Sequence, residues 1–249
     1  MPLAPPAPPP VRRARGPLIP APHPATPPVS GLRRGRPFEI VGERVLLEGA
    51  DWAEYVALSD HPGNRRRKMT FDGPTGRLEI EMAVSKLHEI VLEMLGTMVA
   101  AYRRERRIRV KTSGALSLRS ELLDRGADGD RTYYVSGLDR MPEATAEVLD
   151  LDGGDAPPDL VIEVDVTNPS VPKLPIYAAL GVSEVWTWSA HTVTCRRLND
   201  AGEYEEAADS GELPAFPFAF AADFIRDHAG ADDPTTEDAL LAHLRGAAA

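Results

Sequence analysis

The sequence predicts an α/β or α+β fold built around a mixed β-sheet. One observation is a long amphipathic pattern at about residues 85–107, and a second is the strongly apolar strand PDLVIEVDV at residues 158–166. The third is the order of elements along the chain, which is helix, several strands, helix and more strands. A chain of 249 residues is long enough for one large domain or two small ones.

The first 37 residues are expected to form a disordered or polyproline tail. They contain thirteen prolines and almost no periodic apolar pattern. Residues 1–36 hold six arginines and no acidic residue, so the tail is either an arm that contacts nucleic acid or a partner, or a solvated extension without a chemical role. The folded domain is predicted over residues 38–228, with a C-terminal helix or tail at 229–249.

The first part of the domain reads as short strands around one helical stretch. In FEIVGERVLLE, apolar and polar residues alternate irregularly, as in a short strand. DWAEYVALS suggests a helical turn, and RKMTFDGPTGRLEIEM suggests a hairpin. Asp72-Gly73, with Pro74 and Gly76 close by, supplies the residues that turns favour.

The helix at about 85–107 is the clearest element. Ser85 is a good N-cap. Apolar residues follow the three-four spacing of one buried face: Leu87, Ile90, Val91, Met94, Leu95, Met98, Val99 and Tyr102. Four arginines, at 103, 104, 106 and 107, crowd its last turn. They are either a solvated end that suits the helix dipole or a phosphate contact.

The remaining elements follow from shorter patterns. IRVKTSGALSLRS reads as strands, the charged segment GADGDR leads into the strand TYYVSG, and an acidic loop occupies residues 139–158. After the apolar strand, a short helix at about Lys173 to Leu180 ends at Gly181, a natural C-terminal stop. EVWTWS and TVTCRRL read as sequential strands, and a closing helix is expected from Pro234 to Arg245.

Composition narrows the class of protein. The net charge is −10, and because the first 36 residues carry six positive charges, the rest carries about −16. A domain with this negative charge is expected to bind DNA only through a local basic groove, or with divalent cations that screen the charge. The single cysteine, Cys195, excludes a disulfide framework, and no signal peptide or transmembrane run is recognisable, so a cytoplasmic location is expected.

Acidic residues interrupt the apolar strand, and they mark the candidate active site. Glu163 lies among Leu160, Val161, Ile162 and Val164, where a carboxylate is costly to bury unless a metal ion or a lysine pairs with it. A metal-dependent phosphodiesterase needs carboxylate oxygens for Mg²⁺ and benefits from a nearby lysine. Asp130, Glu163 and Lys173 form one compact set of this kind.

The segment PPDLVIEVDVTNPSVPKLPIYAALGVSEVW resembles the signature of the Uma-two family (Uma2), bacterial restriction-endonuclease-like proteins of the PD-(D/E)XK nuclease superfamily. GRLEIEMAVSKLHEIVLEML and ADGDRTYYV extend the resemblance, which covers roughly residues 50–225. It implies a restriction-endonuclease-like fold, a mixed β-sheet flanked by helices with the site at one end. It also implies that Asp130 binds the metal, that Glu163 is the acid of the (D/E)XK strand, and that Lys173, four residues before Tyr177, supplies the lysine from a helix.

The chain departs from the family pattern at several positions. Asp165 stands where the strand lysine is usual, and Gly129 replaces the proline before the first aspartate, so Asp128 is an alternative to Asp130. By the same resemblance, Glu81 is a possible third metal ligand and His88 an accessory residue that binds phosphate or caps the helix. Asp159 and Asp165 are further accessory candidates, with strand capping as the alternative for Asp159.

Two functions follow from this interpretation. The first is an endonuclease that uses Mg²⁺ or Mn²⁺ to hydrolyse phosphodiester bonds in DNA, expected as a homodimer because cutting both strands favours two-fold symmetry. The second is a catalytically inactive member of the same fold that binds nucleic acid or a protein partner. No nucleophile elbow supports a Ser-His-Asp hydrolase.

Overall fold

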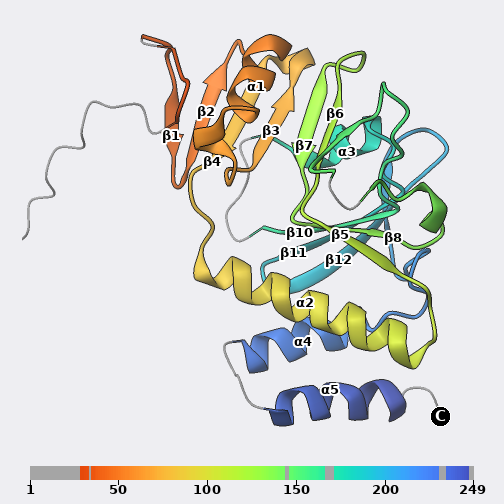
Figure 1. Cartoon of the computed structure of the whole chain (residues 1–249). Coiled ribbons are helices and arrows are strands. Elements are labelled where there is room, and N and C mark those ends of the chain that lie inside the picture. Colours follow the sequence, from red (N-terminus) through yellow and green to blue (C-terminus); the bar gives the residue numbers. More distant parts are fainter. Residues whose placement is uncertain (1–28, 34, 144–145, 166–170, 230–233, 247–249) are drawn as a thin grey trace, which may run out of the picture.

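The computed structural model describes residues 29–33, 35–143, 146–165, 171–229 and 234–246. Two sheets meet near the middle of the molecule, and three helices are stacked beyond one of them (Figure 1). In chain order the elements are β1 (Glu39–Val41), β2 (Arg44–Glu48), α1 (Trp52–Ser59), η1 (Pro62–Asn64), β3 (Met69–Asp72), η2 (Gly73–Thr75), β4 (Arg77–Glu81), α2 (Lys86–Glu105), β5 (Lys111–Gly114), β6 (Ser117–Ser120), β7 (Arg125–Asp128), β8 (Arg131–Tyr134), η3 (Leu138–Arg140), β9 (Val148–Asp150), β10 (Leu160–Val164), α3 (Lys173–Ala179), β11 (Glu184–Ser189), β12 (Thr192–Leu198), β13 (Tyr204–Ala207), α4 (Phe218–His228) and α5 (Pro234–Gly246).

The seven-stranded sheet has the order β1-β2-β4-β3-β7-β6-β9. Its strand pairs are antiparallel except for β6 and β9, which run parallel. One face packs on α1, where Tyr55 stacks on Phe71 with ring centroids 5.0 Å apart. This sheet carries one half of the candidate site.

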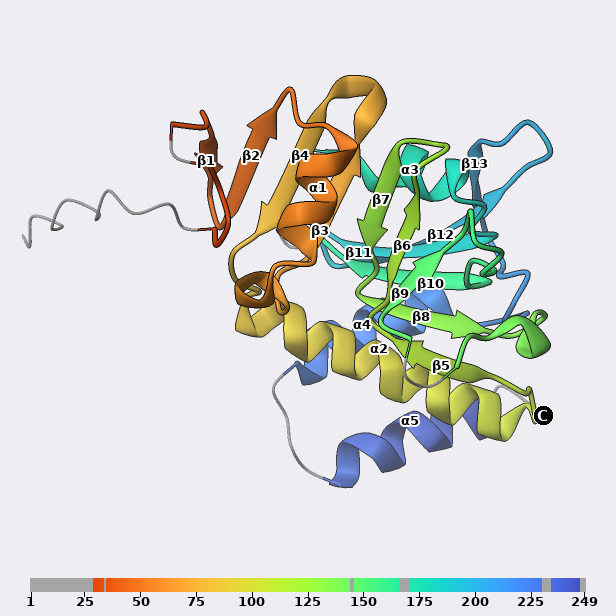
Figure 2. The same cartoon turned by 45° about the horizontal axis from the view of Figure 1, so that its top comes forward.

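The six-stranded sheet has the order β13-β12-β11-β10-β8-β5, and β10 pairs in parallel with β11. One face lies against α2 and α4, and α5 packs on α2 (Figure 2). The other face shares an apolar cluster with α3 and with strands of the seven-stranded sheet. The predicted fold class is therefore confirmed, although the sequence suggested one mixed sheet and the structure has two.

Helix α2 confirms the strongest prediction from the sequence. Ser85 is its N-cap, and its side chain accepts a hydrogen bond from His88 N. The buried face is rotated slightly from the predicted one, because Leu92 is buried whereas Leu87 is 43% exposed. The rotation follows from the partners, since α2 packs on both α4 and α5 as well as on β10.

Four elements were not recognised in the sequence, namely β7, β9, β13 and α4. The charged segment GADGDR shows no strand pattern, yet it overlaps β7. The residues Arg125–Asp128 of this strand include a glycine and an aspartate, which are rare in strands. The acidic loop likewise contains β9. Pairing with neighbouring strands overrides the poor local propensity in both cases.

The N-terminal segment begins to contact the domain before the predicted boundary at residue 37. Val29 and Leu32 are buried in the cluster under α1, and Arg36 forms an ion pair with Glu54 at 3.0 Å. Residues 1–28 of the predicted tail lie outside the described residues. At the other end, the predicted closing helix is α5.

Tyr133 and Tyr134 of β8 and Trp186 and Trp188 of β11 are buried. Helices long and apolar enough to cross a membrane do not occur in the described ranges.

Candidate active site

The candidate site lies where the two sheets meet. Because β3 runs antiparallel to both β4 and β7, the start of β3 and the ends of β4 and β7 share one edge of the seven-stranded sheet. Met69, Glu81 and Asp128 mark these three positions. The chain then crosses from β7 into β8 of the other sheet through Gly129 and Asp130. Asp130 therefore lies at the junction of the sheets.

Gly129 allows the two sheets to come this close. A Cβ atom at this position would lie 2.9 Å from Thr132 Cγ2, which is closer than real Cβ contacts, and 3.4 Å from Val161 Cγ1, which is an ordinary van der Waals contact. A side chain here, including the proline that the family resemblance leads one to expect, would push against Thr132 of β8. The glycine is thus a local adaptation of this chain.

Glu163 faces the site because of the two-residue period of strand β10. Leu160, Ile162 and Val164 contribute to the apolar cluster beneath α2, whereas Val161 packs in the cluster around α3. Glu163 shares the face of Val161, since alternate residues point to the same side of a strand. Its carboxylate therefore points to α3 rather than into the core.

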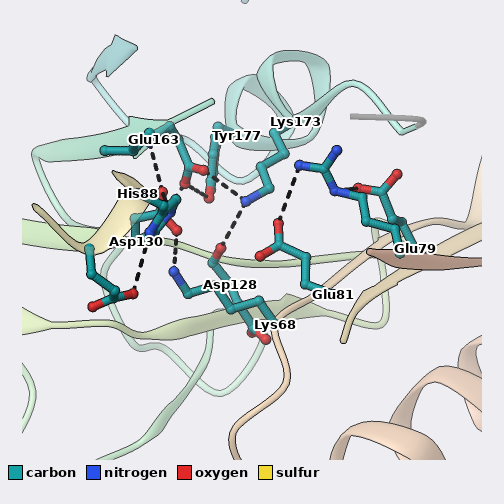
Figure 3. A network of polar contacts seen from close by, with 12 residues as sticks. Lys68, Glu79, Glu81, His88, Asp128, Asp130, Glu163, Lys173 and Tyr177 are labelled. Carbon is teal, nitrogen blue, oxygen red and sulfur yellow. Dashed lines mark hydrogen bonds and ion pairs between the residues drawn. The ribbon is translucent and has the colours of Figure 1, made fainter. Parts of the chain in front are cut away.

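Two residues of α3 hold the Glu163 carboxylate. Lys173 Nζ donates to Oε2 at 2.7 Å, and the Tyr177 hydroxyl donates to Oε1 at 2.6 Å (Figure 3). Residues four apart lie on one face of a helix, so a single short helix presents both donors. The spacing of Lys173 and Tyr177 noted in the sequence thus corresponds to two groups on one carboxylate.

Burial and neighbouring charges together set the pKa values of this group. Desolvation raises the pKa of Glu163, and the ammonium of Lys173 opposes that rise. For Lys173, burial lowers the pKa, but the charges of Glu163 and Asp130 outweigh it and the pKa is raised. The pKa of Tyr177 is raised well above its ordinary value by burial and by Glu163. Lys173 is therefore cationic and Tyr177 neutral at physiological pH.

Asp130 is held by donors from β10, from α2 and from the segment before β3. Its Oδ2 atom accepts from Val164 N at 2.7 Å and lies 3.0 Å from His88 Nε2, while Lys68 Nζ contacts Oδ1. Burial favours the neutral form of Asp130, but His88, Lys173 and Lys68 outweigh it, so the pKa lies well below its usual range. Asp130 N also points at Glu163 Oε1, 3.4 Å away, which links the two acids.

His88 reaches Asp130 from the first turn of α2. Burial lowers the pKa of His88, but the hydrogen bond and charge of Asp130 raise it above the ordinary value overall. The Ser85 cap fixes the backbone here, because Ser85 Oγ accepts from His88 N at 3.1 Å. His88 itself is thus a partner of Asp130 and not the cap.

The alternative first acid, Asp128, has a different environment. Its Oδ2 atom accepts from Met69 N at 2.8 Å, so the carboxylate is directed toward β3. Burial raises its pKa. Its backbone oxygen receives Lys173 Nζ at 3.4 Å. Of the two acids, Asp130 is the one that contacts the chain around Glu163.

A cavity of about 480 Å³ opens onto these groups. Asp130, Glu163, Lys173 and Tyr177 line it together with Glu81 and Asp165. Glu81 extends from the end of β4 but pairs with Arg44, at 3.9 Å. Asp165 follows β10 on the same side as Glu163, in accordance with the strand period.

Asp159 lies apart from the site. Its carboxylate accepts from Val135 N and Gly137 N, each at 2.7 Å, and from Arg140 at 2.6 Å. Asp159 precedes Glu163 by four positions along the strand, a distance of about 13 Å at about 3.3 Å per residue. The accessory role considered for Asp159 is therefore not supported by its position, and its carboxylate organises the turn after β8.

The carboxylates of Asp130 and Glu163 have the hard oxygen donors that Mg²⁺ and Mn²⁺ prefer. The described ranges contain no cluster of three or more His, Cys, Asp or Glu side chains arranged to hold a metal ion. Glu81 lines the cavity and is paired with Arg44. Two acids still fit Mg²⁺, which often takes one or two carboxylates and fills its remaining positions with water and substrate phosphate.

Lys68 was missed in the sequence. It precedes β3 and contacts Asp130, 62 positions away in the chain. Its local pattern is only a basic run followed by a short strand, Arg65-Arg66-Arg67-Lys68, which gave no indication of a partner.

Known proteins that resemble this chain include one solved structure and one protein family. A crystal structure of a putative nuclease from Anabaena variabilis is similar, with 15% identity, a TM-score of 0.42, and coverage of 71% of this chain and 90% of that chain. No curated protein matches the chain. The model of the family Uma2, putative restriction endonuclease, matches residues 52–223. That match spans well over half of the 249 residues, and the chain belongs to the Uma2 family.

Proposed function

We propose that this chain is a metal-dependent endonuclease that hydrolyses phosphodiester bonds in DNA. The observation that most supports the proposal is the convergence of Asp130, Glu163 and Lys173 from β7–β8, β10 and α3 on one cavity. The description of the family points in the same direction.

In this proposal Asp130 and Glu163 hold Mg²⁺ or Mn²⁺. A bound ion of this kind polarises the phosphate and lowers the pKa of a water molecule. Lys173 acts as a hydrogen-bond donor that orients the attacking water or stabilises charge on the phosphate, because its raised pKa keeps it protonated. It is unsuited to be the general base.

His88 and Tyr177 are positioning residues in the same proposal. Each fixes one oxygen of an acid, His88 on Asp130 and Tyr177 on Glu163. Groups of this kind orient metal-binding carboxylates and tune their basicity.

The test is nicking of supercoiled plasmid with Mg²⁺ or Mn²⁺. We expect Asp130→Asn, Glu163→Gln and Lys173→Met to abolish nicking, whereas Asp200→Asn, the same kind of change on an exposed turn, should leave it intact. Calorimetric titration with Mn²⁺ should show binding that Glu163→Gln weakens. Nicking that survives Glu163→Gln would sink the assignment.

One observation favours the second candidate, a catalytically inactive binding module. Each oxygen of Asp130 and Glu163 already faces a protein donor: Lys68, His88, Val164 N, Tyr177 or Lys173. A cation would have to share these oxygens with the protein donors, two of which are the ammonium groups of Lys68 and Lys173. DNA binding by the wild type without metal and without nicking would support this candidate.

Two further features belong to the proposal. We propose a homodimer, since two copies related by two-fold symmetry can cut both strands of a duplex. A cytoplasmic location fits the lone cysteine, Cys195, which is buried and unpaired.

A further inference from the structure

A second cavity, of about 610 Å³, lies beside the candidate site and is basic. Arg65, Arg66, Arg67 and Lys68 line it, together with Arg119. The four consecutive cations connect η1 to β3, and the last of them contacts Asp130. Ser117 and Asp128 line the same cavity, so it adjoins the junction of the sheets.

The basic segment has a fixed backbone. Asn64, which is buried, donates through Nδ2 to Leu58 O at 2.9 Å and to Ser30 O at 2.8 Å. Its backbone oxygen accepts from Arg67 N at 2.7 Å. At the other end, Lys68 O accepts from Glu81 N at 2.9 Å. The arginine side chains are therefore presented from a defined position.

The three arginines lack the acidic partners that neighbouring arginines have. Arg119 pairs with Asp60 at 2.8 Å and Arg125 with Asp72 at 3.0 Å. Within the described part of the chain, Arg65, Arg66 and Arg67 form no ion pair, and Nη1 of Arg67 is buried without an acceptor. A buried donor without an acceptor, such as Arg67 Nη1, is costly. Positive charge concentrated at one place on a chain of net charge −10 indicates an anionic ligand there.

The size of the segment suits a nucleic-acid strand. Three residues extend over at most about 10 Å, and one strand of a DNA duplex carries a charge about every 3.4 Å along its axis. Arginine guanidinium groups match phosphate oxygens in geometry and charge. We propose that Arg65, Arg66 and Arg67 bind the phosphates of a DNA strand next to the phosphate that enters the Asp130–Glu163 cavity, an inference that rests on the proposed function.

The arginines at the end of α2 provide a matched control. His88 is at the site, and Arg104 is sixteen residues further along the helix, roughly 24 Å away at 1.5 Å per residue. Arg103→Gln/Arg104→Gln/Arg107→Gln therefore removes the same charge as Arg65→Gln/Arg66→Gln/Arg67→Gln at a distance from the site. Arg106 is left intact because it lies over the Tyr102 ring.

The experiment is fluorescence anisotropy with a labelled DNA duplex in EDTA, over a series of salt concentrations. For the Arg65–Arg67 triple variant we expect at least about tenfold weaker binding and a slope of log K against log salt reduced by about 2.7, or 0.9 for each phosphate contact. The α2 triple variant should keep the wild-type slope. Circular dichroism melting establishes that both variants are folded.

Three results would overturn the proposal: no binding by the wild type, an unchanged slope in the Arg65–Arg67 variant, or an equal loss in the α2 variant. Plasmid nicking on the same samples separates this inference from the proposed function. If the wild type nicks plasmid but the Arg65–Arg67 variant binds DNA as the wild type does, the proposed role of the three arginines is refuted and the nuclease is not. If DNA binding depends on the three arginines but the wild type does not nick plasmid, their role is supported and the nuclease is refuted.

Discussion

The ion pair between Lys173 and Glu163 should be a major determinant of stability, because it is buried. Its side chains are 12% and 10% exposed, and Nζ lies 2.7 Å from Oε2. Lys173→Met leaves the Glu163 carboxylate without its cation in a desolvated position. Breaking a buried pair from one side costs about 3–5 kcal/mol. For a domain of this size, that corresponds to a decrease in Tm of about 6–20 °C.

The matched control is the pair between Arg226 and Asp223. It has the same 2.7 Å separation, but its side chains are 52% and 62% exposed. Arg226→Met should leave the urea midpoint unchanged, because solvent screens an exposed pair. The double variant Glu163→Gln/Lys173→Met should recover part of the loss, since neither charge is then buried alone.

The measurement is urea unfolding followed by circular dichroism at several pH values. Without Lys173 the pKa of Glu163 rises further, because burial already raises it and the opposing cation is gone. A folded pKa above the unfolded one means that the penalty is absent at low pH and develops as pH rises through the folded pKa. Equal effects of Lys173→Met and Arg226→Met, or a loss that does not depend on pH, would refute this reasoning.

Three other predictions concern separate parts of the molecule. In metal-free protein, NMR titration should give His88 a pKa above 6.5. Asp130→Asn should bring the His88 pKa below 6.5, because burial, which lowers it, is then no longer opposed by the aspartate. The contribution of His88 to the stability of the wild type is present below pH 6.5 and is lost as pH rises through the folded pKa. A His88 pKa that Asp130→Asn does not lower would contradict the contact. Asp159→Asn should destabilise the fold by about 1–3 kcal/mol, because the carboxylate oxygens of Asp159 accept hydrogen bonds from the turn after β8. The same variant should bind Mn²⁺ as the wild type does, since this turn is away from the site, and weaker Mn²⁺ binding in calorimetry would contradict this. Light scattering at micromolar concentration should show a dimer, and a strict monomer would count against cutting by a symmetric pair.

Local patterns predicted those parts of the fold whose structure depends on local properties. The spacing of apolar residues predicted α2, its cap was visible as Ser85, and turn residues predicted the β3–β4 hairpin. Strands β7, β9 and β13 could not be predicted in this way, because their sequences of three or four residues become strands through pairing with other strands. The division into two sheets depends on the same pairings.

The candidate site likewise contains residues that the sequence predicts and one that it does not. Glu163 was recognisable because a carboxylate within an apolar strand requires a partner. Lys173 and Tyr177 were recognisable through the family pattern. Lys68 was not, because its partner lies on another strand and the basic run around it has no distinctive spacing.

The period of β10 couples the site to the core. Leu160, Ile162 and Val164 face α2, while Val161 and Glu163 face α3. A shift of one residue in the pairing of β10 would turn Glu163 toward α2 and its apolar neighbours toward Lys173. Such a register would bury a carboxylate without its cation and would expose three large apolar side chains to the cavity. The free-energy cost of these changes selects the native register of β10 and, with it, the position of Glu163. The acid can therefore remain in a hydrophobic strand without a metal ion, because α3 brings Lys173 and Tyr177 to it.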